Sequence, residues 1–299
     1  MKVHIARLSL VPSAQKTLVE PRFEGTRIEL AERLLVEHTR YIPKKKQGFI
    51  SLIFGGFIFE TDGRLLSAKL GKAKEMKLLD YDDDKKDFLD MEYTSYPYVY
   101  LLWDRDEQVM LIERDTSVFR NYETVLNSIE DHLNNLLAEY ELRVFIEPLT
   151  EKADFWRTIQ MFKYIYEVTF ELHMPNFLGK TQGHLKEILK MFEEEYNATG
   201  VSTRISNPDG RLDIPEYDPQ TNTNLEWITK GGGSWSISGK KEGRKIRTKI
   251  TSTKSQNIKT EETSIEFENY NAGEVIAILS VLRPNYSERS VQGEDDENK

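Results

Sequence analysis

The chain has 299 residues, 38% of them apolar and 30% charged, and its formal net charge is −9. This length suits two domains or one extended mixed domain, and the modest acidic excess disfavours a surface that coats nucleic acid or anionic membrane as a whole. The chain contains no cysteine, which excludes disulfides, thiolate nucleophiles, cysteine-ligated zinc and iron–sulfur clusters.

The chain begins with residues 1–7, which alternate as a strand does and lack the apolar core of a signal peptide. No window of the sequence approaches the roughly 18 apolar residues that a membrane-spanning helix needs. We therefore expect a cytoplasmic protein that does not enter a membrane.

In the first part of the chain, apolar periodicity and turn residues predict strands, tight turns and two helices. The predicted elements are a strand over 3–11, a helix over 27–42 that Pro43 ends, strands over 49–60 and 64–70 around the turn 61–63, strands over 96–103 and 109–113, and a helix over 122–140 that Asn121 caps. Residues 80–90 hold six aspartates and two lysines, and this density of charge indicates a solvated loop.

The strand from Phe49 to Phe59 carries apolar residues on both of its faces. Such a strand is either central in its sheet or covered on one face by another subunit. We expect a homodimer or a larger homo-oligomer, and a monomer would favour the central position instead.

The second part of the chain alternates strands with helices. The predicted strands cover 142–147, 166–174, 201–206 and 234–250, and the predicted helices are one through Phe155 and Phe162 with Thr150 as its cap, one over 185–192 and one over 275–282. We expect an α+β fold of mixed, largely antiparallel sheets with helices packed mainly on one face. The expected domains are a hairpin-rich unit over 1–118, a β-α-β-α-β unit over 119–286 and a disordered acidic tail over 287–299.

Motifs for catalysis or cofactor binding are weak. The glycines 231–233 would suit a phosphate-binding loop only if a helix began directly after them, whereas residues 235–238 alternate as a strand does. The five histidines are isolated, and we predict no metal site and no cofactor. A metal-dependent nuclease needs clustered carboxylates and a lysine that steadies the phosphate. Asp209, Glu226 and Lys230 come nearest to this pattern if residues 226–230 form a strand, although the lysine is two positions late.

The basic ribbon, residues 238–259, is the main candidate site. It holds eight basic residues and one acid, Glu242, so its net charge is +7 in a chain of −9, and Gly243 indicates a turn within it. Such a ribbon can follow the phosphates of nucleic acid or bind an acidic protein surface; alternatively, it is an edge strand whose lysines prevent aggregation. The candidate binding residues are Lys240, Lys241, Arg244, Lys245, Arg247, Lys249 and the neighbouring Trp235, whose ring could stack on bases.

Several short segments resemble an uncharacterised bacterial family of unknown function, over about residues 120–260. They are Ile146-Glu147-Pro148 at a strand end, Phe155-Trp156 in a helix, Met174-Pro175-Asn176 after a strand, and the placement of glycines 231–233 and of the threonine-rich basic stretch through Thr251 and Thr253. Genes of that family lie near anti-phage defence loci. The resemblance therefore implies a role in the conflict between phage and bacterium, on either side, and it identifies no functional residue.

We expect a non-enzymatic binding protein of phage–host conflict that engages nucleic acid or a protein partner through the basic ribbon. One alternative is a metal-dependent nuclease with a diverged carboxylate site. Another is a structural subunit that forms oligomers within a larger complex.

Overall fold

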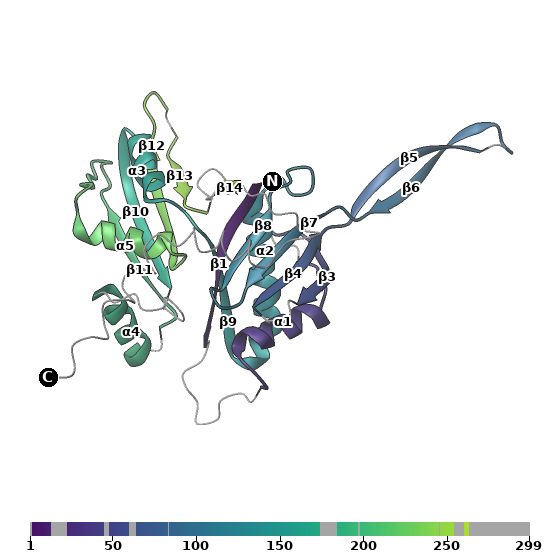
Figure 1. Cartoon of the computed structure of the whole chain (residues 1–299). Coiled ribbons are helices and arrows are strands. Elements are labelled where there is room, and N and C mark those ends of the chain that lie inside the picture. Colours follow the sequence, from purple (N-terminus) through teal and green to yellow (C-terminus); the bar gives the residue numbers. More distant parts are fainter. Residues whose placement is uncertain are drawn as a thin grey trace.

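The computed structural model describes residues 2–12, 23–44, 48–59, 64–82, 84–173, 184–196, 198–244, 246–253 and 260–262. These residues form two packed units and a projecting two-stranded arm (Figure 1). The expected α+β class is confirmed, because helices pack on sheets whose paired strands are antiparallel. The predicted turn 61–63, the helix over 275–282 and the tail over 287–299 lie outside the described residues. None of the described helices is long and apolar enough to cross a membrane.

The first unit is built on one large antiparallel sheet in the strand order β14-β1-β8-β7-β4-β3-β2, with β9 also paired to β1. The long strand β1 joins its parts, because residues 3–7 pair with β8 while residues 6–12 pair with β9. The strands are β1 (Lys2–Pro12), β2 (Arg40–Tyr41), β3 (Leu52–Phe59), β4 (Leu65–Gly71), β7 (Tyr98–Asp104), β8 (Val109–Glu113), β9 (Leu142–Pro148) and β14 (Thr260–Glu262).

Two helices, α1 (Arg27–Glu37) and α2 (Tyr122–Leu137), contribute their apolar residues to the core of this unit. The Asn121 side chain accepts the Thr124 N–H, which confirms the predicted cap of α2. Helix α1 was expected to reach residue 42. It ends at Glu37 because Arg40 and Tyr41 pair with β3 as a short strand instead. Strand β3 thus has neighbours on both sides, as its central-strand explanation requires, although Ile58 stays 57% exposed.

The second unit is a four-stranded antiparallel sheet in the order β11-β10-β12-β13. Its elements are α3 (Lys152–Gln160), β10 (Tyr164–His173), α4 (His184–Tyr196), β11 (Gly200–Ser206), α5 (Pro219–Thr229), β12 (Gly233–Lys240) and β13 (Thr248–Thr251). All three helices contribute to one apolar core against the sheet. The predicted cap of α3 is wrong, since Glu151 occupies the cap position and the buried Thr150 hydroxyl has no hydrogen-bond partner.

The division between the units differs from the expected boundary at residues 118 and 119. Helix α2 and strand β9 both belong to the core of the first unit, and the second core begins at Phe155. Strand β14, which follows the described elements of the second unit, pairs with β1. The second unit is therefore inserted between β9 and β14 of the first, and this separation could not be read from the local sequence pattern.

The arm consists of β5 (Lys74–Asp82) and β6 (Asp87–Ser95), which pair along their whole length. It projects away from the large sheet, to the right in Figure 1. The prediction of a solvated loop over 80–90 is therefore wrong. Cross-strand pairs such as Leu78 with Met91 and Tyr81 with Phe88 form a regular ladder there despite the surrounding aspartates.

Gly233 gives a direct test of the second unit's packing. Its φ is +147°, and a Cβ atom would lie 2.0 Å from the Glu171 carbonyl oxygen, so we expect Gly233→Ala to lower the free energy of unfolding by about 1–3 kcal/mol. Gly55→Ala is the matched control, because its Cβ would meet no atom within 4 Å, and a change within about 0.5 kcal/mol is expected. Urea titration followed by circular dichroism measures both, and equal stabilities would contradict the close approach at Gly233.

Candidate nucleic-acid interface

The four-stranded sheet has one face that its helices do not cover, which we call the open face. Side chains that point into the apolar core alternate with those of the open face, because successive residues of a strand point to opposite sides. Val168, Phe170, Trp235 and Ile237 occupy the core side. Register and alternation assign to the open face Glu167, Thr169, Glu171, Ser202, Arg204, Ser206, Ser234, Ser236, Ser238, Lys249 and Thr251.

Short hydroxyl side chains dominate the middle of the open face. Ser236 lies between Thr169 and Thr251 on neighbouring strands, and Ser238 lies between Glu167 and Lys249. Thr169 and Ser238 are buried, whereas Ser236 and Thr251 are half-buried and offer hydroxyls that can donate to phosphate oxygens. The predicted strand over 201–206 is confirmed. The segment 234–250 forms two strands, β12 and β13, and the turn predicted at Gly243, where φ is +69°, lies between them.

Glu167 holds two arginines over the open face. Its Oε2 lies 2.5 Å from Arg204 Nη2 and 3.8 Å from Arg247 Nη2. Arg247 also donates to the Ser238 hydroxyl at 2.7 Å, and its guanidinium lies over the Tyr166 ring, 4.7 Å from the centroid. One carboxylate between two guanidiniums leaves a net positive charge. The hydrogen bond to Ser238 and the contact with the Tyr166 ring hold the Arg247 guanidinium in its orientation.

The ribbon tip, residues 241–247, projects beyond the sheet at the opposite side of the molecule from the arm (Figure 1). Arg244 and Ile246 are exposed, the latter by 76%, and Lys163 forms an ion pair with Glu242, the one acid of the tip. The Lys163–Glu242 pair lowers the pKa of the Glu242 carboxyl through its hydrogen bond and charge. Among the predicted binding residues, Lys240, Lys241, Arg244, Arg247 and Lys249 lie together on this ribbon, and Lys245 lies outside the described residues.

Trp235 cannot stack on bases. Its side chain is 1% exposed and packs edge-to-face against Phe155 at 5.4 Å, so it belongs to the core. Trp227, the other tryptophan near the basic ribbon, is also buried and donates its ring N–H to the His173 carbonyl. Strand alternation alone could have assigned Trp235 to the core, because it is in phase with Ile237.

The structure does not bring together the three residues considered for a nuclease. Residues 219–229 form helix α5, with Asp218 as its cap and Pro219 in its first turn, rather than the strand on which that pattern depends. Glu226 pairs with Lys152 at 2.7 Å. Asp209 lies in the turn beside the start of β10, whereas Lys230 lies beside its end, about 30 Å away along ten strand residues. Within the described ranges, no three His, Asp or Glu side chains are placed to hold a metal ion.

A second group of polar residues lies where the two units meet, and we call it the seam. His173, at the end of β10, stacks on Phe145 of β9 with ring centroids 4.1 Å apart, and its Nε2 lies 2.8 Å from Glu147 Oε1. The Arg143 guanidinium also lies over the Phe145 ring, 4.8 Å from its centroid. Strand alternation places Glu171 and His173 on one face of β10, but the sequence carries no signal for the partner strand β9.

No protein-family model matches the chain, and no curated protein matches its sequence.

Glu130 of α2, behind β9, carries a carboxyl with a raised pKa. It accepts the Ile146 N–H at 2.8 Å, and burial raises the pKa of its carboxyl to about 7, with a smaller contribution from Glu147 in the same direction and opposing ones from His173 and Arg143. It lines a cavity of about 480 Å³ together with Asp131. A carboxyl with this pKa can exchange a proton near neutral pH. Its bond to β9 also gives it a structural role.

This raised pKa predicts a dependence of stability on pH. The folded state binds the Glu130 proton more tightly than the unfolded state, so the resulting stabilisation is complete below pH 4.5 and is lost as the pH rises through about 7. We expect the Glu130→Gln variant, which keeps an acceptor for Ile146, to gain up to about 3 kcal/mol on the wild type between these limits. Urea titrations of both proteins at pH 5 and pH 8 measure the difference, and parallel pH profiles would contradict it.

Proposed function

We propose that the protein is a non-enzymatic binding protein that holds nucleic acid by its phosphate backbone across the open face and the basic ribbon. The observation that carries the proposal is the pair of arginines on Glu167, set among hydroxyl rows and beside Lys240 and Lys249. Phosphate oxygens accept from guanidinium, ammonium and hydroxyl groups, and all three kinds of donor occur on this face.

The proposal concerns backbone contacts and not the reading of sequence. Among the described residues that alternation assigns to the open face none is large and apolar, the nearby Tyr166 ring lies under Arg247, and both nearby tryptophans are buried. Backbone contacts are electrostatic and are therefore sensitive to salt. We expect single- and double-stranded nucleic acids to bind with affinities that depend little on their base sequence.

The resemblance over residues 120–260 supplies the biological setting of the proposal. We propose that the protein acts in the conflict between phage and bacterium, in the cytoplasm, where viral and host nucleic acids are both accessible. An acidic protein surface is the second candidate ligand, favoured by the exposed charges of the ribbon tip. The structural-subunit alternative has its own support in the arm.

Charge reversal on the sheet provides the test. The double variant Lys240→Glu, Lys249→Glu replaces two positive charges beside the Glu167 pair, and we expect it to reduce affinity at least about tenfold because like charges then face the phosphates. Mobility-shift titrations with random-sequence DNA and RNA measure the effect. For the wild type, log affinity should fall with log salt concentration by about 0.9 for each phosphate contact on duplex DNA.

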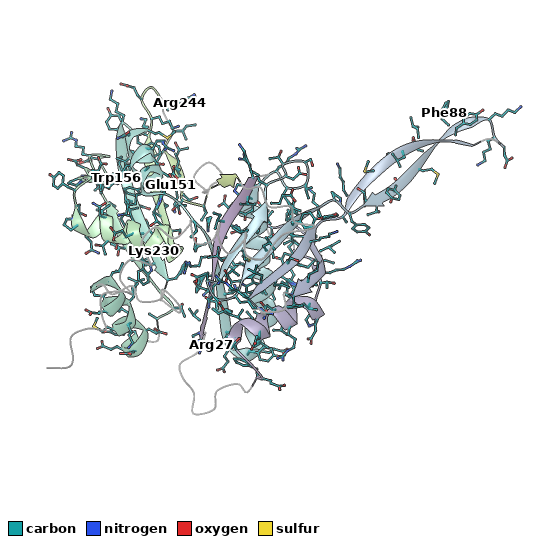
Figure 2. The ribbon with its side chains drawn as sticks, viewed as in Figure 1. Arg27, Phe88, Glu151, Trp156, Lys230 and Arg244 are labelled. Carbon is teal, nitrogen blue, oxygen red and sulfur yellow. The ribbon has the colours of Figure 1, made fainter. Side chains whose placement is uncertain are left out.

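The matched control makes the same change of net charge elsewhere. Arg27→Glu, Arg33→Glu alters two exposed residues of α1 in the first unit, and Figure 2 shows Arg27 far from Arg244 of the basic ribbon. This control should bind like the wild type. Equal losses of affinity in both variants would mean that the effect comes from net charge alone. If the wild type changes the mobility of neither DNA nor RNA at low salt, nucleic acid is excluded as the ligand.

A further inference from the structure

Two features of the arm are unfavourable when it is surrounded by water alone. It is a lone two-stranded ribbon, and isolated ribbons of this kind are marginally stable. It also exposes large apolar side chains along both faces. Their exposed fractions are 37% for Met76, 47% for Leu78, 73% for Leu79, 48% for Tyr81, 67% for Phe88, 51% for Met91 and 58% for Tyr93.

The outer half of the arm has its own pattern, and we call it the arm tip. Leu79, Tyr81 and Phe88 share one face there, with the Tyr81 and Phe88 rings packed edge to face at 5.3 Å. In sequence, residues 74–95 hold eight carboxylates against four lysines, a net charge of −4. The arm tip is thus both apolar and acidic, which a solvated loop would not need.

The basic ribbon has the complementary pattern. Residues 240–249 hold six basic residues and one acid, a net charge of +5. Ile246 is 76% exposed among them, and Tyr164 and Met161 beside the ribbon root are 41% and 42% exposed. The apolar residues of the ribbon tip lie within a basic surface and those of the arm tip within an acidic one. In a contact between the two, burial of the apolar side chains and attraction of the opposite charges both favour binding.

We propose that the arm tip of one copy docks on the ribbon tip of a second copy. Phe88 lies at the far end of the arm and Arg244 at the end of the ribbon, on opposite sides of the molecule, so that the arm cannot reach the ribbon of its own chain (Figure 2). Charge complementarity selects the second copy's ribbon over its arm, since two arms carry like charge.

This contact joins two different surfaces and is therefore heterologous. A heterologous contact generates a ring when its rotation closes and a filament when it does not. Each copy in such an assembly uses one arm tip and one ribbon tip. A docked arm occupies the ribbon-tip part of the basic ribbon, and the open face beside it stays available to nucleic acid. The contact forms without nucleic acid, so that its failure and the failure of nucleic-acid binding are distinguishable.

The test uses two charge-reversed variants of the full chain, freed of nucleic acid. One carries Asp87→Lys, Asp90→Lys in the arm, and the other carries Lys241→Glu, Arg244→Glu in the ribbon. Sedimentation velocity at low salt should show the wild type as a concentration-dependent assembly and each variant alone as a monomer, with self-affinity reduced at least about tenfold. An equimolar mixture of the two variants should assemble again, because each arm then meets a ribbon of opposite charge.

Rescue in the mixture is a result that a merely unfolded variant would not give. Phe88→Ser should also weaken self-assembly while leaving charge unchanged. The arm-reversed variant should not rescue it, because neither copy in that mixture has an intact arm. A wild type that stays monomeric at high concentration and low salt would overturn the proposal. Assembly that survives the ribbon reversal but not the arm reversal would overturn it as well, since the arm would then have another partner.

Discussion

The backbone of β9 must find partners on the side that faces away from β1, and much of the molecule depends on how it does so. In the described part of the chain β9 pairs with β1 alone, and a buried amide without a partner is costly. Side chains of α2 replace the missing strand: Asn134 both donates to and accepts from Val144, and Glu130 accepts from Ile146. This arrangement fixes α2 against the sheet and turns the outward side chains of β9 toward the second unit.

The seam follows from that constraint. Because α2 covers the edge of β9, the side chains of Phe145 and Glu147 on the face of that strand remain available. The His173 ring stacks on Phe145, and its Nε2 pairs with Glu147. A second contact, from Thr253 to Glu123 at the start of α2, ties the end of the basic ribbon to the same helix. Two points of attachment on one helix and its strand hold the second unit, with its open face and ribbon, against the first.

Local patterns predicted the regular elements well and the placement of side chains less well. Strong periodicity and Asn121 identified α2, and the hairpin of β7 and β8 was found from its turn residues. Helix α5 was missed because its apolar residues are few and its signals, Asp218 and Pro219, look like a loop. The arm was missed because the density of aspartates over 80–90 indicated a loop, although apolar residues alternate on both sides of this segment. The Glu167 arginines and the seam depend on strand neighbours and could not be read from spacing.

The pairing of β1 with β14 has a consequence for synthesis. Residues 2–4 leave the ribosome before their partners at 260–262, which follow only after the described elements of the second unit. At the roughly 5–20 residues per second of translation, this strand waits on the order of tens of seconds. During that interval part of one edge of β1 is open to pairing with other chains. The nascent protein therefore stays open to misassociation at this edge until β14 has been made, and slower elongation would prolong the exposure.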